Sequence, residues 1–560
     1  MVLWLKNTFK NRWKDLLFAL GMTCILMLPY IFKDFLGIEH DTFFHISRIE
    51  QLSKSIQNGN FLPAIYPSEN NNYGYASPLF YSDFFLIIPA LLHLAGLSLA
   101  FCYKFIVFIA SFLSIYAMIL FTSHLTKKRS ITWIAGCAYL FSNYRITDIY
   151  VRGALGEIFA FSFLPLMLLG LYEIIEEDHC SYFTLTISIT CLALSHNLTF
   201  LLSSILCALF VILSIHKLTK KKIICISISI FFAFLLSCFF TLPMLEQLKS
   251  QSFIVDYYGQ SSDLSSHSMN LWQFFVNETI FGYSGNTYDA SMAMTVNVGW
   301  FLTFAPITYI FVKKKDPFVI KLLIIGYICL ILPSSIFPWD KIPLQILQFP
   351  WRFNTLSMVL LSAPAALGIS NLLKKSILRY IVIVVLCTEC IYHVYPAYSR
   401  TFGITSKTTW SDILDGELCD PYYSAYYVRV ELAGGDYLPL SSPDFRGRSP
   451  TIKDSNNNDL NISYTTDYNK ITFNTDSLES NTQLIMPKTW YKGYTVYQIK
   501  DGKKIKVECS SNNESMVTFY AEKDSTYILT YEDTPLRKIC LSVSLLSFMI
   551  WIIVLKKSSS

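Results

Sequence analysis

The chain has 560 residues, of which 53% are hydrophobic and only 15% are charged. Its mean hydropathy of +0.40 is far above that of a soluble enzyme, so the composition excludes a soluble globular protein. The formal net charge of +5 is accounted for by short basic clusters beside apolar segments, and it gives no indication of nucleic acid binding. The sequence predicts an all-α polytopic membrane protein.

Apolar segments of roughly 17 to 24 residues recur along nearly the whole chain, and each is long enough to cross a hydrocarbon core of ~30 Å as a helix. The first is too long for a signal peptide and lacks a small-residue cleavage site, so we expect it to remain as a span. We predict about twelve transmembrane helices, at residues 15–32, 101–123, 131–146, 154–173, 182–197, 199–216, 223–245, 296–312, 318–337, 353–372, 377–396 and 539–555.

The basic clusters set the predicted orientation. They can all lie in the cytoplasm only if one apolar stretch, residues 79–97, is not a crossing. This stretch contains Pro89 and follows a polar run, so we interpret it as a helix along the outer membrane surface. Both termini are then cytoplasmic.

This topology places three longer regions outside, at residues 33–100, 246–295 and 397–537. The last alternates short β-prone runs with Asn, Asp, Gly and Ser clusters, which predicts an extracytoplasmic β-sandwich-like domain. The predicted strands are Tyr422 to Leu432, Asn461 to Tyr464, Ile471 to Phe473, Tyr494 to Ile499 and Met516 to Tyr520. The predicted domains are a transmembrane domain at 1–396, the β-rich domain at 397–537, and a C-terminal helix with a cytoplasmic tail at 538–560.

The 14 cysteines lie mostly in apolar spans, where Cys behaves as a small hydrophobic residue. Only Cys419 and Cys509 fall in the polar domain, and their spacing leaves a disulfide between them open.

Titratable residues are concentrated just after the first apolar segment. If a helix begins after Glu39, then Asp41, His45 and Arg48 stand at i, i+4 and i+7 on one face. A carboxylate could deprotonate an acceptor hydroxyl while a cation neutralises a phosphate leaving group. The alternative is an interfacial helix whose charges lie among lipid headgroups and water.

A second polar cluster precedes the span at 154–173. Arg145, Asp148 and Arg152 are spaced so that one helical turn would aim two guanidinium groups around one carboxylate, and Arg suits bidentate phosphate binding. Glu157, at the start of the span, needs a partner because an unpaired carboxylate there is costly. The alternative is a purely structural network of salt bridges between helix ends.

Two further residues are candidates near span ends. His196 lies between two short spans, where it is either a helix-packing group or a neighbour of the site. Arg352 enters a span among aromatic residues, which indicates either anchoring to lipid headgroups or contact with the phosphate of a carrier.

Several runs of this sequence resemble a family of bacterial membrane proteins described as 6-pyruvoyl-tetrahydropterin synthase-related, which are close to the YfhO-type proteins. The resemblance runs from residue 39 to about 355 and is weaker afterwards. Both groups look like GT-C superfamily glycosyltransferases. The residues that carry it are His40-Asp41, Phe44-His45, Arg48, Asn58-Gly59, Tyr66-Pro67, Asn72 to Tyr75, Pro78 to Tyr81, Tyr144-Arg145, Asp148, Val151 to Glu157, Ser195-His196, Gln348 to Phe353, and more weakly Gly434 to Pro439 and Trp490 to Tyr494.

The resemblance implies a multi-span enzyme of the bacterial cell membrane that moves a sugar from a polyprenyl-phosphate carrier to a glycan or lipid-linked acceptor at the outer face. In such folds the first outer loop carries an essential acidic residue, which matches Asp41. The implied catalytic residues are Asp41, His45 and Glu157. The implied substrate-binding residues are His40, Arg48, Arg145, Asp148, Arg152, His196 and Arg352.

No cofactor is required on this interpretation, although Glu39, His40, Asp41 and His45 leave a divalent metal ion open. Pterin chemistry finds no support, since the nine His residues include no H-x-H pair. The sequence contains no glycine-rich loop that would bind the phosphates of a nucleotide. We therefore expect the energy for the reaction to come from the substrate itself, as an activated lipid would supply it. The alternatives are a transporter or flippase of lipid-linked glycans and a non-catalytic scaffold for cell-envelope assembly.

Overall fold

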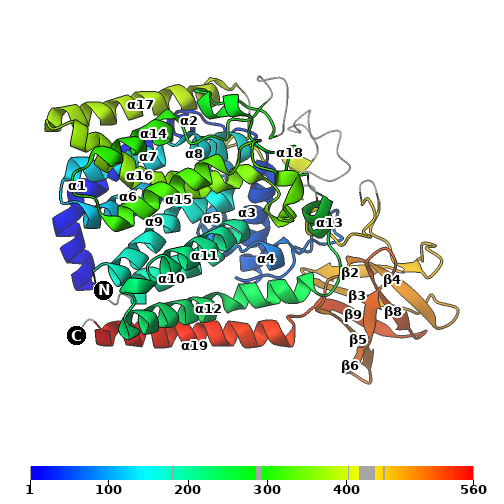
Figure 1. Ribbon diagram of the computed structural model, residues 1–560. Helices are drawn as coiled ribbons and strands as arrows, with labels where there is room; N and C mark the ends of the chain where they lie inside the picture. Colours follow the sequence, from blue (N-terminus) through cyan, green and yellow to red (C-terminus); the bar gives the residue numbers. More distant parts are fainter. Residues whose placement is uncertain are drawn as a thin grey trace.

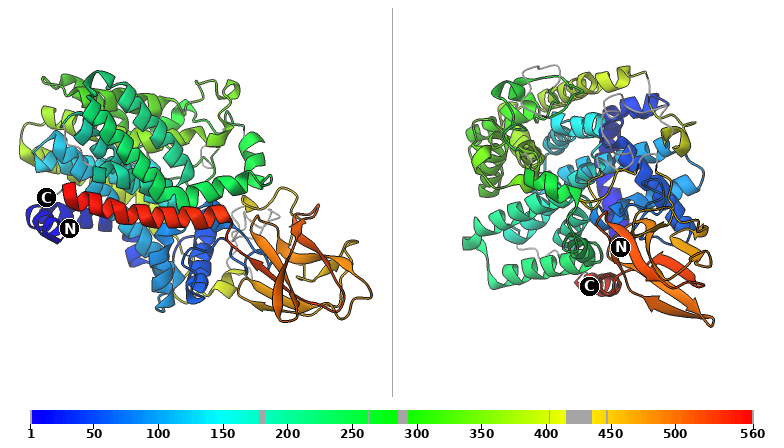
Figure 2. Two further views of the ribbon diagram at one scale, coloured as in Figure 1. Left: turned by 90° about the horizontal axis from the view of Figure 1, so that it is seen from below. Right: turned by 90° about the vertical axis from the view of Figure 1, so that its right-hand side faces the viewer.

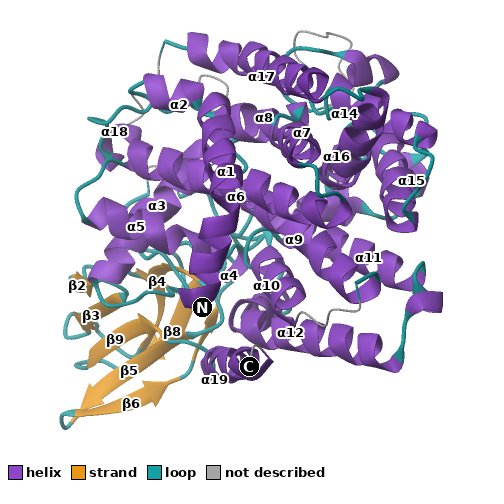
Figure 3. Cartoon of the chain, turned by 90° about the vertical axis from the view of Figure 1, so that its left-hand side faces the viewer, coloured by secondary structure: helices purple, strands orange, loops and turns teal. Residues whose placement is uncertain are grey.

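The computed structural model describes residues 2–177, 182–261, 263–284, 293–401, 403–414, 435–445 and 448–558. A large helical body carries a β-rich domain at one end (Figure 1). Figure 3 shows the helices and the strands as two distinct parts of the molecule. The predicted fold class, a helical membrane protein with a separate β-rich domain, is confirmed.

Helices occupy each of the twelve predicted span ranges. In chain order they are α1 (Val2–Leu26), α2 (Leu28–Phe32), α3 (Thr42–Gln57), α4 (Ser77–Phe80), η1 (Phe84–Leu86), α5 (Ile87–Leu94), α6 (Leu99–Leu125), α7 (Arg129–Leu140), α8 (Asn143–Thr147), η2 (Asp148–Arg152), α9 (Leu155–Ile175), α10 (Tyr182–Ala193), α11 (Asn197–Ile212), η3 (Ile215–Lys217), α12 (Lys220–Leu248), α13 (Ile254–Ser261), η4 (Leu271–Phe275), α14 (Trp300–Phe304), η6 (Ala305–Phe311), α15 (Pro317–Ile331), η7 (Trp339–Lys341), η8 (Gln345–Leu347), η9 (Pro350–Arg352), α16 (Phe353–Leu372), α17 (Ser376–Ser399), α18 (Trp410–Leu414) and α19 (Pro535–Ser558).

Within the described ranges, six helices are long and apolar enough to cross a membrane. They are Leu99–Leu125, Leu155–Ile175, Lys220–Leu248, Pro350–Leu372, Ser376–Ser399 and Pro535–Val554. The span predicted at 15–32 falls on α1 and α2, and the other predicted spans are represented by shorter helices. The span predicted at 131–146 ends at Leu140, where the chain turns into α8. The number of crossings and the orientation of the termini stay predictions.

The stretch predicted to lie on the membrane surface is broken into short pieces. η1 is followed by α5, whose eight residues rise only about 12 Å, too little for a crossing. Ile88 and Leu91 expose 54% and 43% of their surface. A short helix with an exposed apolar face suits an interfacial position.

The start of α1 and the end of α19 lie at the same end of the helical body, opposite the β-rich domain (Figure 1). α19 runs alongside α12, where the Ser544 hydroxyl accepts a hydrogen bond from the backbone N–H of Phe239 at 3.2 Å. Figure 2 shows the β-rich domain beyond the far end of α19. The last helix therefore ties this domain to the helical body.

The β-rich domain is a sandwich of two antiparallel sheets. Its strands are β1 (Lys453–Asp454), β2 (Tyr464–Asp467), β3 (Lys470–Asn474), β4 (Thr482–Thr489), β5 (Tyr494–Lys500), β6 (Lys503–Val507), β7 (Cys509–Ser511), β8 (Met516–Ala521) and β9 (Thr526–Tyr531). The sheet orders are β1-β4-β8-β7 and β2-β3-β9-β5-β6. Phe473, Phe519 and Tyr527 pack between the sheets, so alternating apolar residues form the core.

Three predicted strands correspond to β3, β5 and β8, whereas the strand predicted at Asn461 to Tyr464 begins only at Tyr464. The strand predicted at Tyr422 to Leu432 and the Cys419 half of the disulfide lie outside the described residues. β1, β4, β6, β7 and β9 were not predicted.

The β-rich domain docks on the first loop, which we define as residues 33–98. Lys488 on β4 is buried and its ammonium donates to the carbonyl oxygens of Pro67 at 3.0 Å and Asn72 at 2.5 Å. The turn that supplies these carbonyls contains Asn70, Asn71 and Asn72, all with positive φ, which Asn tolerates better than most residues. This contact fixes the loop that carries the first candidate residues.

Candidate active site

The backbone places Asp41 at the start of α3, directly against η2. The N–H groups of His40 and Asp41 donate to the carbonyl oxygens of Val151 and Arg152 at 3.1 and 2.8 Å. η2 is a single π-helical turn, a feature common at functional sites. It ends at Gly153, with φ of 64°, where a Cβ atom would lie 3.0 Å from the Thr42 hydroxyl. Glycine is needed here because both the conformation and the close approach exclude a side chain.

Asp41 has the free carboxylate of this region. It is partly exposed, and none of the described residues forms a hydrogen bond or ion pair with it. Burial raises the pKa of this carboxyl above its usual value, while the nearby Arg152 and Arg352 oppose the rise. An accessible carboxylate with a raised pKa is suited to accept a proton.

Two carboxylates of the first loop near Asp41 are paired. Glu39 accepts from Arg400 at 2.9 Å and from the Thr42 hydroxyl at 2.5 Å, and Asp83 accepts from Arg48 at 2.6 Å. Burial raises the pKa of Glu39 to about 7 despite the Arg400 guanidinium. These ion pairs hold the first loop in place. Glu39 and Asp83 therefore have a structural role that the Asp41 carboxylate does not have.

The predicted helical face of Asp41, His45 and Arg48 forms, but the three side chains do not act alike. Arg48 donates from two nitrogens to Asp83 and from Nη2 to the Ser82 carbonyl at 2.8 Å. The Arg48 guanidinium thus has its charge compensated within the loop, and the prediction that it binds phosphate receives no support from its surroundings.

Both ring nitrogens of His45 are engaged. Nε2 accepts from the backbone N–H of Leu155 at 3.3 Å, and Nδ1 lies 3.2 Å from Nη1 of Arg48. Burial and the Arg48 charge lower the pKa of His45 well below its usual value. A neutral imidazole held at the start of α9 positions that helix, and it leaves Asp41 as the more suitable base.

The second predicted cluster converges around Arg152 instead of around one carboxylate. Arg152 Nη1 donates to Asp148 and, at 2.7 Å, to Glu157. Glu157 also accepts from the hydroxyls of Tyr144 at 2.8 Å and Thr355 at 2.5 Å. Glu157 is therefore a buried junction between α8, η2, α9 and α16.

Arg145 departs from the predicted geometry. Its Nη2 donates to the Ser111 hydroxyl at 3.3 Å and its guanidinium lies over the Phe161 ring, 5.1 Å from the centroid. It makes no hydrogen bond with Asp148 within the described part of the chain. The predicted arrangement of both guanidinium groups around Asp148 does not form, and the chain changes from α-helical to π-helical geometry between Arg145 and Arg152.

Arg352 and His196 are the two predicted residues whose surroundings agree best with a substrate-binding role. Arg352 donates from Nη1 to the Leu347 carbonyl at 3.0 Å, and its buried Nε has no partner among the described residues. His196 Nδ1 accepts from the Thr199 N–H, which leaves Nε2 to carry the hydrogen in the neutral ring. Both residues are electrostatic neighbours of Glu157.

The side chain of His40 contacts a residue from the middle of the sequence. Its ring stacks on Tyr283 with centroids 4.9 Å apart and planes 7° apart. The burial of this ring and the positive charge of Arg152 lower its pKa to about 4. His40 thus holds the segment before α14 against the first loop.

Asp436 was missed by the sequence analysis as a site residue, although Gly434 to Pro439 were part of the family resemblance. It lies in the segment before the β-rich domain, and its carboxylate is an electrostatic neighbour of Asp41 and Arg352. Burial and the Asp41 charge raise its pKa to about 7. No sequence signal links residues 41 and 436, since only the fold brings them together.

Metal binding was left open by the sequence. Within the described ranges, no group of three or more His, Cys, Asp or Glu side chains could hold a metal ion. His40 and Glu39 are turned to Tyr283 and Arg400, so the four residues predicted as ligands do not converge.

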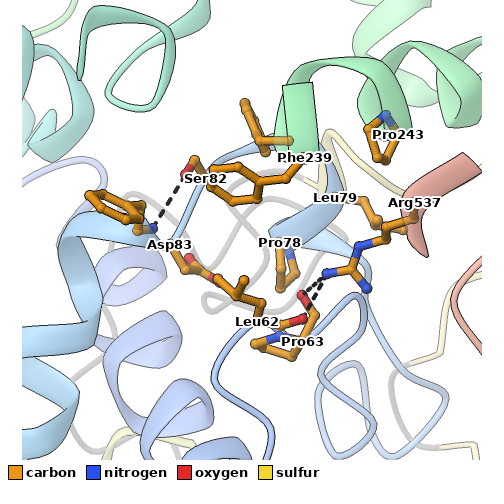
Figure 4. Close-up of a pocket in the computed structure, with 11 residues that line it drawn as sticks. Leu62, Pro63, Pro78, Leu79, Ser82, Asp83, Phe239, Pro243 and Arg537 are labelled. Atoms are coloured by element: carbon orange, nitrogen blue, oxygen red, sulfur yellow. Dashed lines mark hydrogen bonds between the residues drawn. The ribbon is translucent and has the colours of Figure 1, made fainter. Parts of the chain in front are cut away.

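A small pocket lies behind the first loop, where Figure 4 shows Asp83 and Ser82 facing Phe239 and Pro243. On its other side, Arg537 of α19 donates to the carbonyl oxygen of Leu62 at 2.7 Å. The pocket marks the place where α12 and α19 brace the loop behind the Arg48 and Asp83 ion pair.

The fold and this site define a helical membrane protein whose polar cluster lies where the first loop, η2 and α16 meet. A family model described as "6-pyruvoyl-tetrahydropterin synthase related domain; membrane protein" matches residues 79–397. The match covers more than half of the chain, so the chain belongs to this family, and the resemblance found in the sequence is confirmed.

Two further similarities are more remote. An uncharacterized protein of Lactococcus lactis subsp. cremoris is 24% identical over 257 residues, which cover 44% of this chain and 42% of that protein. The cryo-EM structure of the arabinofuranosyltransferase AftD from Mycobacteria is similar over 69% of this chain and 27% of that chain, with 13% identity and a TM-score of 0.45. The chain thus matches less than half the length of either protein.

Proposed function

We propose that this protein is a membrane glycosyltransferase of the GT-C type that transfers a sugar from a polyprenyl-phosphate carrier to a cell-envelope glycan or lipid-linked acceptor. The observation that carries the proposal is the unpaired, partly exposed carboxylate of Asp41 beside Arg352, whose Nε has no partner among the described residues. A base and an unused cation side by side suit an attack by a hydroxyl group on a carbon bonded to phosphate.

In the proposed reaction, Asp41 takes the proton of the acceptor hydroxyl. The acceptor oxygen then forms a bond to the anomeric carbon as the bond from that carbon to the phosphate oxygen breaks, and the electron pair leaves with the lipid phosphate. Arg352 stabilises the charge that develops there, while the ion pair of Arg152 with Glu157 holds the site in shape. The proposal requires no metal ion or other cofactor.

The test is transfer by the purified full-length protein in liposomes with a panel of polyprenyl-phosphate sugars and a mixed glycan acceptor. Asp41→Asn should lower turnover about 10²- to 10⁴-fold, as the loss of a general base does. Asp34→Asn is the matched control, since Asp34 is an exposed acid of the same loop and, within the described part of the chain, accepts only from Ser406, at 3.3 Å.

Equal turnover by the wild-type protein and Asp41→Asn would remove Asp41 from the mechanism. Movement of intact lipid-linked glycan across the vesicle, without transfer, would identify a flippase instead. In the wild type, activity should rise with pH, with a midpoint above the ordinary pKa of an aspartate, because burial raises the pKa of Asp41 and only the ionised form is a base.

A further inference from the structure

A short strap connects the β-rich domain to the candidate site. We define the strap as residues 435–440, which lie in the chain before β1. It pairs with the segment that begins α13: the N–H of Val255 donates to the Asp436 carbonyl at 2.8 Å, and the N–H of Leu440 donates to the Ser252 carbonyl at 2.9 Å. These bonds fix the backbone on both sides of Tyr437.

Tyr437 anchors the strap on the first loop. Its ring stacks on Phe80 with centroids 5.2 Å apart and planes 2° apart, and it lies 6.5 Å from the ring of Phe44. Its N–H donates to the Tyr75 hydroxyl at 3.1 Å, and its carbonyl accepts from the Tyr491 hydroxyl at 3.0 Å. Phe44 is in the first turn of α3, so the strap lies over the end of the helix where Asp41 stands.

The side chain of Asp436 is left without a structural partner. It is partly exposed, and none of the described residues donates to its carboxylate or pairs with it. The backbone of the strap is held by other residues, so this acid is not needed to fix the strap. Its charged neighbours are Asp41 and Arg352.

Arg352 gives an independent indication that a ligand belongs here. Its side chain is 7% exposed, and its Nε has no partner among the described residues. A buried guanidinium nitrogen without a partner is costly unless a ligand or water satisfies it. Asp41, Asp436 and this donor are electrostatic neighbours, so the site offers carboxylates to hydroxyl groups and a cation to a phosphate.

We propose that Asp436 is a positioning residue that binds acceptor hydroxyl groups beside Asp41, so that the strap makes the β-rich domain part of the acceptor site. This inference rests on the proposed glycosyl transfer. Two neighbouring carboxylates bind adjacent hydroxyl groups of a sugar and repel an anion, so the acceptor is a neutral polyhydroxylated glycan and not an anionic phospholipid.

The test compares wild-type protein with Asp436→Asn, Asp436→Glu and Asp467→Asn in full-length form. Asp467 is an exposed acid at the end of β2, far in sequence from the strap, and serves as the control. Asp436→Asn should raise the KM for a neutral oligosaccharide acceptor about 10- to 100-fold, with the KM for the donor within twofold of wild type. Asp436→Glu should restore most of the acceptor affinity.

The pH profile separates positioning from a structural role. Asp41 is faced by Arg152, Arg352 and Glu157, whereas the charged neighbours of Asp436 are Asp41 and Arg352. Since the pKa of Asp436 is about 7, the acceptor KM of the wild type should fall as the pH rises through this value, and this dependence should be lost in Asp436→Asn. An unchanged acceptor KM, or equal rises in the acceptor and donor KM values, would overturn the inference.

A binding measurement keeps the inference testable apart from turnover. Wild-type protein should bind the neutral oligosaccharide at least tenfold more tightly than Asp436→Asn does, and more tightly than it binds a phosphorylated version of the same oligosaccharide. Equal affinities would overturn the role of Asp436. A wild-type protein that binds the glycan in this way but transfers no sugar would instead contradict the proposed function.

Discussion

The backbone N–H of Asp41 donates to the carbonyl oxygen of Arg152 at 2.8 Å. This bond joins the first loop to η2, more than a hundred residues later in the chain. Because Arg152 itself is paired with Asp148 and Glu157, its positive charge is held in place while the Asp41 carboxylate stays free. One residue therefore supplies reactivity and the other supplies a fixed field.

The two arginines of the site should behave differently on substitution. Arg352→Gln should fold normally and raise the donor KM about 10- to 100-fold, since among the described residues Arg352 donates only to the Leu347 carbonyl. Arg152→Gln should instead lower the melting temperature, because it leaves Asp148 and Glu157 buried without their cation. Thermal unfolding and donor kinetics on both variants check this, and similar stability losses would contradict it.

Gly156→Ala should disturb the site through Tyr81. A Cβ atom at this position would overlap the Tyr81 hydroxyl and lie 2.7 Å from the Ser195 carbonyl oxygen. We expect a loss of roughly 1–3 kcal/mol in stability and a fall in activity, because α9 cannot move without disturbing Glu157. Gly21→Ala is the matched control, since no atom lies within 4 Å, and it should be neutral or slightly stabilising in thermal unfolding.

The Glu39 and Arg400 pair can be tested by a double-mutant cycle. Arg400→Ala should cost about 3–5 kcal/mol, since it leaves a buried carboxylate, and added Glu39→Gln should recover part of that loss. Burial raises the pKa of Glu39 to about 7, so the carboxyl favours the protonated form in the folded state. The instability of Arg400→Ala should therefore be relieved as the pH falls through about 7, and a pH-independent loss would contradict this explanation.

Lys488 should make stability depend on pH in the alkaline range. Burial lowers its pKa to about 8, below the usual value for lysine, so the cost of keeping it charged in the folded state disappears as the pH rises from about 8 to about 10.5. The difference in melting temperature between wild type and Lys488→Met should change in favour of wild type across this range. A difference that stays constant with pH would show that burial does not lower the pKa of Lys488.

The sequence alone determined the class of protein and several local features. Its composition required a membrane, the acid at position 41 followed by apolar residues predicted the start of α3, and alternating runs predicted β3, β5 and β8. These features depend on local periodicity and on the cost of apolar surface in water, which neighbouring residues set.

Only the tertiary structure decided which charges are free. Arg48 was a candidate phosphate ligand until Asp83, 35 residues away, compensated its charge, and Asp436 entered the site from the far end of the chain. Whether a buried charge is paired depends on groups that folding brings together from distant elements. The sequence could place Asp41 near the membrane surface, but only the fold shows that none of the described residues pairs with its carboxylate.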